Sequence, residues 1–61
     1  MKFRGSFNIL RSKDGKYYFV LKAKNGEVIA TSEMYNSLQG CLGGIRSVRV
    51  TAPIAKIVYQ P

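Results

Sequence analysis

Two pairs of residues that favour tight turns, Asp14-Gly15 and Asn25-Gly26, divide the first half of the chain into three runs. Asp-Gly and Asn-Gly supply the positive φ angles that short β-hairpin turns need, and Asn-Gly is the strongest short-range hairpin signal. Apolar and polar residues alternate in the first two runs, as in a strand with one covered face. The pattern therefore predicts a three-stranded antiparallel meander. Its strands are expected at residues 3–11, 16–23 and 27–31.

After the third run, apolar residues recur every three or four positions, which is one stripe of an amphipathic helix. The stripe consists of Leu38, Cys41, Leu42, Ile45, Val48 and Ala52. Asn36 or Ser37 can cap its start, and Asn36 with Gln39 has the spacing of a capping box. Pro53 predicts its end, because the residue before a proline is driven out of the α region. Three glycines within this stretch lower its helix propensity, so we expect packing against the sheet to hold it.

Residues 54–59 alternate again and predict a fourth strand. The expected fold class is therefore α+β, with the order β-β-β-α-β, an antiparallel sheet and one helix over one sheet face. A chain of 61 residues has room for a single domain, which we place at residues 1–61.

Such a short chain is marginal on its own. Apolar burial contributes roughly 85 kcal/mol, and ordering the backbone and side chains costs about 90 kcal/mol. Small domains make up this difference with disulfides, a metal or a partner subunit. The chain has one cysteine, Cys41, and no histidine, so neither an internal disulfide nor a zinc site is expected. A partner chain is the stabiliser that remains.

Four segments of the sequence carry a resemblance to known proteins. They are Phe7 to Ile9, Asp14 to Ala23, Asn25 to Tyr35, and Gly44-Ile45-Arg46-Ser47-Val48 followed by Ala52-Pro53. In these segments the chain resembles the YegP-like family of small bacterial proteins of unknown function. The resemblance implies a β-β-β-α-β unit that occurs twice in one chain or forms a homodimer, with one continuous sheet and exchanged C-terminal strands. With one unit here, it implies a homodimer in which residues 54–59 of each chain pair with the other.

The sequence offers no catalytic machinery. Its only acids are Asp14, Glu27 and Glu33, and paired-carboxylate catalysis would need two of them to converge on one pocket. The glycines between residues 40 and 44 lack the lysine of a phosphate-binding loop. We therefore expect no enzyme activity, no cofactor and no metal. The principal hypothesis is a small non-enzymatic homodimeric structural or interaction module.

An alternative follows from the net charge of +7, which arises from ten Lys and Arg against three acids. Basic residues beside an aromatic ring on a sheet face can stack single-stranded bases and hold phosphates. The candidate contacts for weak, non-specific nucleic-acid binding are Arg4, Lys16, Tyr18, Lys22, Arg46 and Arg49. The competing interpretation is a solvated face whose lysine stems cover apolar surface.

A second alternative is a small-ligand site between the third strand and the helix, at Ser32, Glu33 and Tyr35. Backbone N–H groups at a helix N-terminus attract anions there. The same residues can instead satisfy the loop's own backbone, with Tyr35 packing against the helix. Cys41 is open to two interpretations as well, either a reactive thiol or, on the apolar stripe, a buried small hydrophobe.

The location is expected to be the cytoplasm. A single unpaired cysteine indicates a reducing compartment, and the residues that follow Met1 show no apolar signal region. No run approaches the ~20 apolar residues of a membrane span, so a membrane partner is not expected.

Overall fold

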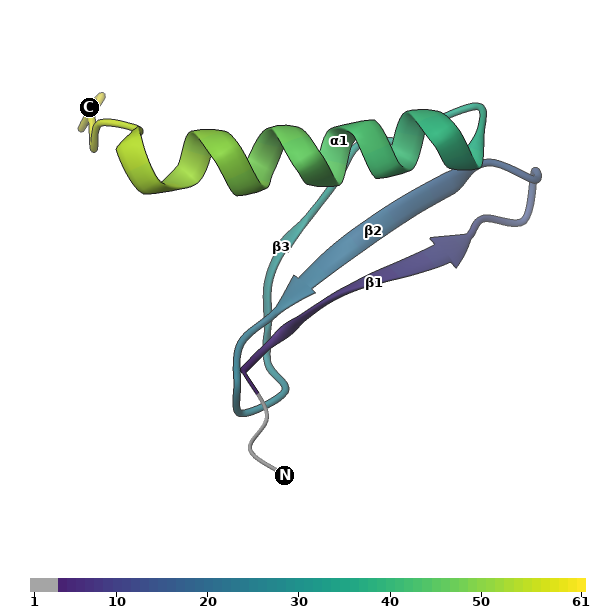
Figure 1. Cartoon of the computed structure of the whole chain (residues 1–61), viewed down its shortest axis with the longest axis horizontal. Helices are drawn as coiled ribbons and strands as arrows, with labels where there is room; N and C mark the ends of the chain where they lie inside the picture. Colours follow the sequence, from purple (N-terminus) through teal and green to yellow (C-terminus); the bar gives the residue numbers. More distant parts are fainter. Residues whose placement is uncertain (1–3) are drawn as a thin grey trace.

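The computed structural model describes residues 4–61 and contains a three-stranded antiparallel sheet with one helix against one face (Figure 1). The strands lie in the order β1-β2-β3. Their bounds are β1 Ser6–Arg11, β2 Tyr17–Lys22 and β3 Val28–Thr31, followed by α1 Leu38–Thr51 and the 3₁₀ helix η1 Ala52–Ile54. The predicted meander and helix are confirmed. The start of the first predicted strand, at Phe3, lies outside the described residues.

Both predicted turns form where the glycine pairs stand. Gly15 and Gly26 have φ angles of 85° and 89°, in the region that side chains disfavour. The Gly15 N–H donates to the Ser12 carbonyl at 3.0 Å, and the Gly26 N–H donates to the Ala23 carbonyl at 2.9 Å. The first turn sets a register in which Ile9 faces Phe19.

The helix is capped by Ser37, whose hydroxyl accepts a hydrogen bond from the Gly40 N–H at 3.0 Å. The predicted capping box of Asn36 with Gln39 is wrong, because the cap lies one residue later and Gly40 occupies the third helical position. At the other end, the α-helix stops at Thr51 and a 3₁₀ turn follows, with Pro53 near its start. A backbone N–H at this position has no acceptor within the helix, so proline's lack of an N–H costs no hydrogen bond.

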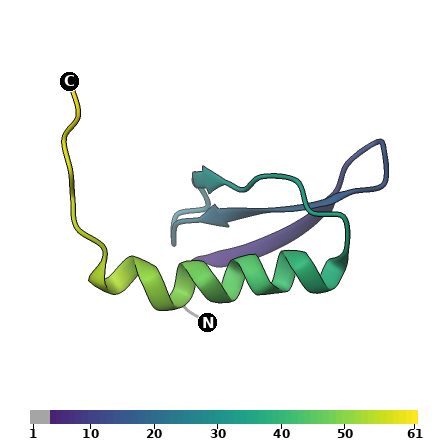
Figure 2. The same cartoon turned by 90° about the horizontal axis from the view of Figure 1, so that it is seen from above.

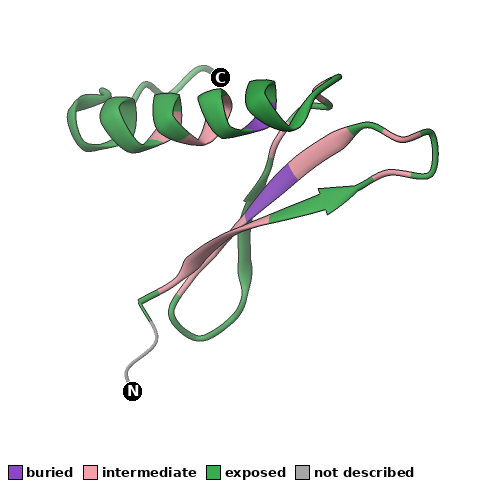
Figure 3. Cartoon of the chain, turned by 45° about the vertical axis from the view of Figure 1, so that its right-hand side comes forward, coloured by how far each residue is buried: buried purple, intermediate pink, exposed green. Residues whose placement is uncertain are grey.

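The core is small and lies where the first half of α1 crosses β2. Among the described residues the buried apolar side chains are Phe19 on the helix side of β2, Val20 on its opposite face, and Cys41 of α1, which has no exposed surface. Figure 3 shows the buried parts of β2 and α1 in purple. The ring of Phe19 stacks on Tyr35 at 6.2 Å between centroids and meets Phe7 edge-on at 5.8 Å. This aromatic row joins β1, β2 and the segment before α1 on the helix side of the sheet.

The predicted apolar helix stripe is covered over only part of its width. Leu38 and Leu42, which we expected in the core, are 47% and 49% exposed. The reason is geometric: the sheet has three strands, and α1 lies over it only near β2. Because Cys41 faces the sheet, Leu38 and Leu42 on either side of it lie where the sheet does not cover the helix.

The fourth strand predicted at residues 54–59, which was expected to pair with another copy, does not form in the single chain. Ile54 ends the 3₁₀ turn, and the segment 55–61, here called the tail, has no regular structure and is exposed throughout. Figure 2 shows the tail leaving the end of α1 and standing clear of the sheet. A strand needs a neighbouring edge for its backbone hydrogen bonds, and the tail meets none within its own chain.

Candidate interaction surfaces

The outer edge of β1 offers unpaired backbone groups. The Ser12 N–H donates to the Lys16 carbonyl at 2.8 Å, which continues the β1–β2 ladder beyond the strand ends. Along an antiparallel strand, residues that hydrogen-bond to the neighbouring strand alternate with residues whose backbone groups point away from it. The N–H and C=O groups of Phe7, Ile9 and Arg11 therefore point away from β2, and β1 is an edge strand of the sheet. This edge can accept another strand.

The chain exposes more surface than a compact protein of its mass. Its accessible area is 5459 Å², against about 4,000 Å² expected for 6.8 kDa, an excess of roughly 1,500 Å². Its radius of gyration is 13.0 Å, whereas about 10.5 Å is expected for this length. Several large apolar side chains contribute to this exposed surface. The large apolar side chains that are at least half exposed are Val28, Ile29, Met34, Val50, Ile54, Ile57, Val58 and Tyr59.

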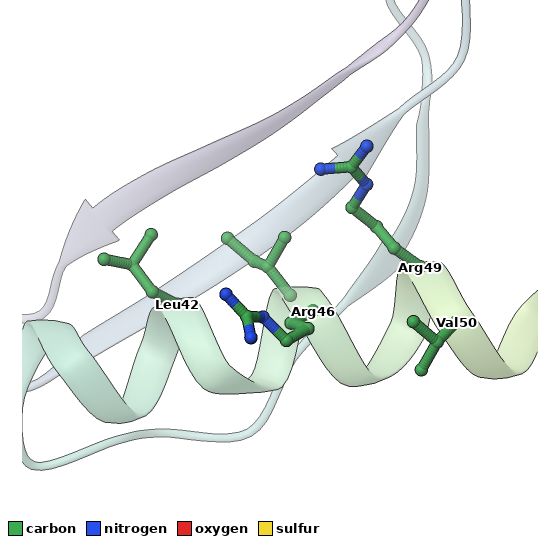
Figure 4. A pocket seen from close by; sticks show the side chains of 5 residues that line it. Leu42, Arg46, Arg49 and Val50 are labelled. Atoms are coloured by element: carbon green, nitrogen blue, oxygen red, sulfur yellow. The ribbon is translucent and has the colours of Figure 1, made fainter.

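A shallow groove of about 600 Å³ runs along α1 (Figure 4). Its lining residues recur at three- and four-residue spacings on one side of the helix, and we call them the helix stripe. They are Leu42, Ile45, Arg46, Arg49 and Val50. Figure 4 shows Leu42 and Arg49 extending toward the side on which the sheet lies, with Arg46 between them along the helix. The helix stripe combines apolar side chains with two guanidinium groups.

The residues proposed for nucleic-acid contact fall on two sides of the molecule. Tyr18 and Lys22 alternate with Phe19 on β2, so they lie on the sheet face away from α1. Arg46 and Arg49 are on α1, across the sheet. Lys16 precedes β2 on the same alternation as Tyr18. Arg4 is exposed just before β1. The structure thus groups Lys16, Tyr18 and Lys22 and separates them from the helix arginines.

The residues proposed for a small-ligand site are engaged by the fold. The Ser32 hydroxyl accepts from the Phe19 N–H at 2.9 Å and donates to the Glu33 carbonyl at 2.8 Å. Tyr35 exchanges two backbone hydrogen bonds with Tyr17, at 2.7 and 2.8 Å, and its ring lies on Phe19. Glu33 is exposed. The groove on α1 lies elsewhere, along residues 42–50.

Two further side chains have well-defined surroundings. Cys41 is a free thiol in the core, packed as a small hydrophobe would be. Asp14 lies in the first turn, where the Ser12 hydroxyl donates to its carboxylate. This hydrogen bond, assisted by the charge of Lys16, lowers the pKa of the Asp14 carboxyl below its ordinary value.

Over residues 4–61, His, Cys, Asp and Glu side chains nowhere gather in a group of three that could hold a metal ion. In the same part of the chain, no helix combines the length and the apolar character that crossing a membrane requires.

The sequence pattern did not separate the helix stripe from the core. It assigned Leu42 and Ile45 to the covered side of the helix and passed over Val50. The signal was present, since residues 42, 45, 46, 49 and 50 also have helical spacing. The pattern does not contain the width of the sheet, and that width decides which residues on this side of the helix are covered.

A three-stranded meander with one helix, an unpaired sheet edge and an exposed tail defines a small α+β protein whose main features are surfaces rather than a pocket. Residues 12–58 match the family described as domain of unknown function DUF1508. The chain belongs to this family, the YegP-like or UPF0339 proteins, whose biochemical function is unknown.

Individual relatives agree in sequence and fold. The chain is 56% identical to a UPF0339 protein of Treponema denticola over 54 residues, covering 88% of this chain and 93% of the relative. It is 47% identical to the UPF0339 protein YegP of Yersinia pestis over 49 residues, covering 80% of this chain but 44% of the relative. A protein from Haloferax volcanii solved by NMR shares the fold, with a TM-score of 0.84, 30% identity, and coverage of 95% and 98%.

Proposed function

We propose that the protein is a non-enzymatic interaction module that acts as a homodimer with exchanged C-terminal strands. The observation that carries the proposal is the excess of roughly 1,500 Å² over a compact chain's ~4,000 Å², given the accessible area of 5459 Å². If each of two chains covered that excess, the contact would bury roughly 3,000 Å² in total, within the range of permanent dimers. A partner copy would also supply the burial that so short a chain lacks.

The β1 edge and the tail are complementary in this arrangement. The edge has outward backbone groups at Phe7, Ile9 and Arg11, and the tail has a free backbone and no strand beside it. A tail paired there would place alternate side chains on the two sheet faces. We propose that Ile57 and Tyr59 join the helix side, next to Phe7 and Ile9. These tail side chains are 101% and 87% exposed in the single chain.

Light scattering after size-exclusion chromatography tests the proposal. We expect a molar mass of twice 6.8 kDa at micromolar concentration, independent of salt because the contact is mainly apolar. A mass of 6.8 kDa across the accessible concentration range would mean that the dimer is wrong.

The cytoplasmic location and the absence of catalysis belong to the same proposal. The thiol of Cys41 is buried and unpaired, as suits a reducing compartment. The three acids stand in a turn, at the start of a strand and in a loop, and Asp14 is engaged by Ser12. We therefore assign the protein a binding role.

Weak nucleic-acid binding is the second candidate, favoured by the common face of Lys16, Tyr18 and Lys22. An aromatic ring between two ammonium groups can stack a base and hold its phosphates. We expect the anisotropy of a labelled single-stranded oligonucleotide to rise on addition of protein at about 50 mM salt and to fall steeply toward about 200 mM. Replacing Tyr18 by Ser should weaken binding, whereas Lys13→Ser, at a turn, should change it less. Flat anisotropy at the lower salt would eliminate this candidate.

A further inference from the structure

We propose that the groove along the helix stripe receives the tail of a second copy of this chain, with the partner's Ile57 against Leu42. The ring of the partner's Tyr59 then lies against the guanidinium group of Arg49. This inference rests on the proposed homodimer and adds a site to it, because pairing with the β1 edge does not by itself fill the groove. Its basis is that the groove and the open edge of β1 lie on the same side of the molecule.

The side of α1 that carries the groove follows from a contact of Gly44. This glycine lies against the side chain of Tyr35. Tyr35 pairs with Tyr17 along the margin of β2 at which β3 also pairs, opposite the margin that holds β1. Leu42 and Arg49 lie about 150° around the helix from Gly44, at about 100° per residue. Because both extend toward the sheet, they lie on the β1 side of α1 (Figure 4).

The direction of α1 suits a partner tail that is antiparallel to β1. The helix begins soon after Tyr35, which pairs with Tyr17, and Tyr17 faces Arg11 at the end of β1. From there α1 runs in the opposite sense to β1 (Figure 1). A tail antiparallel to β1 therefore runs in the same sense as α1. Residues directly opposite each other in such a pair share a sheet face, so the partner's Ile57 lies opposite Ile9.

The spacing of the tail side chains matches the groove. The partner's Tyr59 follows Ile57 by about 7 Å along a strand, on the same face. Leu42 and Arg49 are separated by about 10.5 Å along the helix. Side chains on a helix lean toward its N-terminus, so the long side chain of Arg49 reaches back over this difference. One apolar contact and one aromatic contact therefore fit along the groove.

Charge favours an aromatic ring beside Arg49. Residues 34–61 carry no carboxylate side chain, so this arginine has no acid along its own helix with which to pair. A guanidinium group within about 6 Å of a ring centroid is attracted to the face of the ring. The fold already contains such a contact, because the guanidinium carbon of Arg11 lies 4.9 Å from the centroid of the Tyr17 ring. Tyr59 is 87% exposed in the single chain and is available for the same role.

The tail of the same chain cannot occupy the groove in this way. From Leu42 to Ile54 the chain rises about 19 Å, in nine α-helical steps and three 3₁₀ steps. From Ile54 to Ile57 an extended chain spans at most about 11 Å. A tail that runs in the same sense as α1 carries Ile57 still farther from its own Leu42. The occupant is therefore a second copy, and Figure 2 shows the tail of the single chain pointing away from its own sheet.

Disulfide cross-linking tests the contact directly. Leu42→Cys with Ile57→Cys should give, on mild oxidation, a covalent species of twice 6.8 kDa, because bridged cysteines need Cα atoms within about 7 Å. Ser47→Cys with Ile57→Cys is the matched control. Ser47 lies about 140° around the helix from Leu42, so this variant should not cross-link. Cys41 is buried and common to both variants.

A double-mutant cycle tests the contact between Tyr59 and Arg49. Arg49→Gln should weaken the dimer about tenfold, since the symmetric dimer loses two such contacts. Arg46→Gln removes the same charge farther around the helix and should change the dissociation constant less. Tyr59→Leu should weaken the dimer, whereas Tyr59→Phe keeps the ring and should not. In the Tyr59→Leu background, Arg49→Gln should have no further effect. Sedimentation velocity over a dilution series measures each dissociation constant.

The outcomes separate this inference from the homodimer. A wild-type molar mass of 6.8 kDa at all concentrations would end both. A wild-type dimer in which the cysteine pair at 42 and 57 fails to cross-link, or in which the Ser47 control cross-links equally, would leave the homodimer standing and overturn the docking of the tail in the groove. Additive effects of Arg49→Gln and Tyr59→Leu would overturn the assignment of Tyr59 to Arg49.

Discussion

Gly44 is a residue at which α1 lies close against the aromatic row. A methyl group there would overlap the hydroxyl and ring of Tyr35 and come within 3.3 Å of the Phe19 ring. Gly43, its neighbour, would meet nothing within 4 Å. The two glycines have the same helix propensity but different surroundings. Comparing substitutions at the two positions therefore distinguishes the effect of close packing from the effect of backbone flexibility.

Gly44→Ala should therefore destabilise the protein and Gly43→Ala should stabilise it. Overpacking against Tyr35 costs about 1–3 kcal/mol, which exceeds the gain of up to about 1 kcal/mol from replacing a helical glycine. Gly43→Ala receives that gain without the clash. Urea unfolding at a single fixed protein concentration measures both. Equal effects of the two substitutions would show that helix packing at Gly44 is looser than described.

Asp14 gives a prediction about pH. The hydrogen bond from Ser12 is the main cause that lowers the pKa of its carboxyl. Because the folded pKa lies below the unfolded one, this group stabilises the fold above its unfolded pKa and loses that contribution as pH falls through the folded pKa. Ser12→Ala should raise the Asp14 pKa toward its ordinary value, followed by the carboxyl carbon shift in NMR. Lys16→Gln should move it less, since the lysine charge is a smaller cause.

At the scale of elements, α1 depends on its cap and on one line of contact. Its glycines give little helix propensity, and the buried contact is concentrated at Cys41. The Ser37 cap satisfies the Gly40 N–H, one of the amides that the first turn leaves unpaired. The cap also determines where the chain turns from the Tyr35 bridge into the helix.

We expect Ser37→Ala to lower the free energy of unfolding by about 1 kcal/mol, the usual loss at a capping position. Asn36→Ala, one residue earlier and exposed, serves as the matched control and should change stability by less than half of that amount. Thermal and urea unfolding would measure both. A larger loss of stability for Asn36→Ala than for Ser37→Ala would show that Asn36 is the capping residue.

For the whole molecule, the excess surface and the exposed tail lead to one expectation. In the proposed homodimer each Ile57 leaves water, and burying such a side chain contributes about 1.5–3 kcal/mol per copy. Ile57→Asp should therefore shift the dimer toward monomer by several kcal/mol, because two carboxylates would be buried without partners. Gln60→Asp introduces the same charge near the chain end and should leave the dimer intact. Sedimentation velocity over a dilution series would compare them, and identical behaviour of the two would argue against an exchanged tail.

The sequence by itself determined the local structure. The turns at Gly15 and Gly26, the alternation along β1 and β2, and the periodicity of α1 each depend on neighbours within a few residues, so they could be predicted. The choice of Ser37 over Asn36 as the cap could not, since both residue types cap helices and only the path from the Tyr35 bridge distinguishes them.

The tertiary structure alone decided which sides of these elements are covered. Periodicity shows that residues share a helix side, but the width and position of the sheet decide that Cys41 is buried while Leu42 is half exposed. The tertiary structure likewise places Arg46 and Arg49 on the opposite side of the sheet from Tyr18 and Lys22. The tail has the alternation of a strand but forms none in the single chain, because a strand also requires an edge to pair with, and no local pattern supplies that edge.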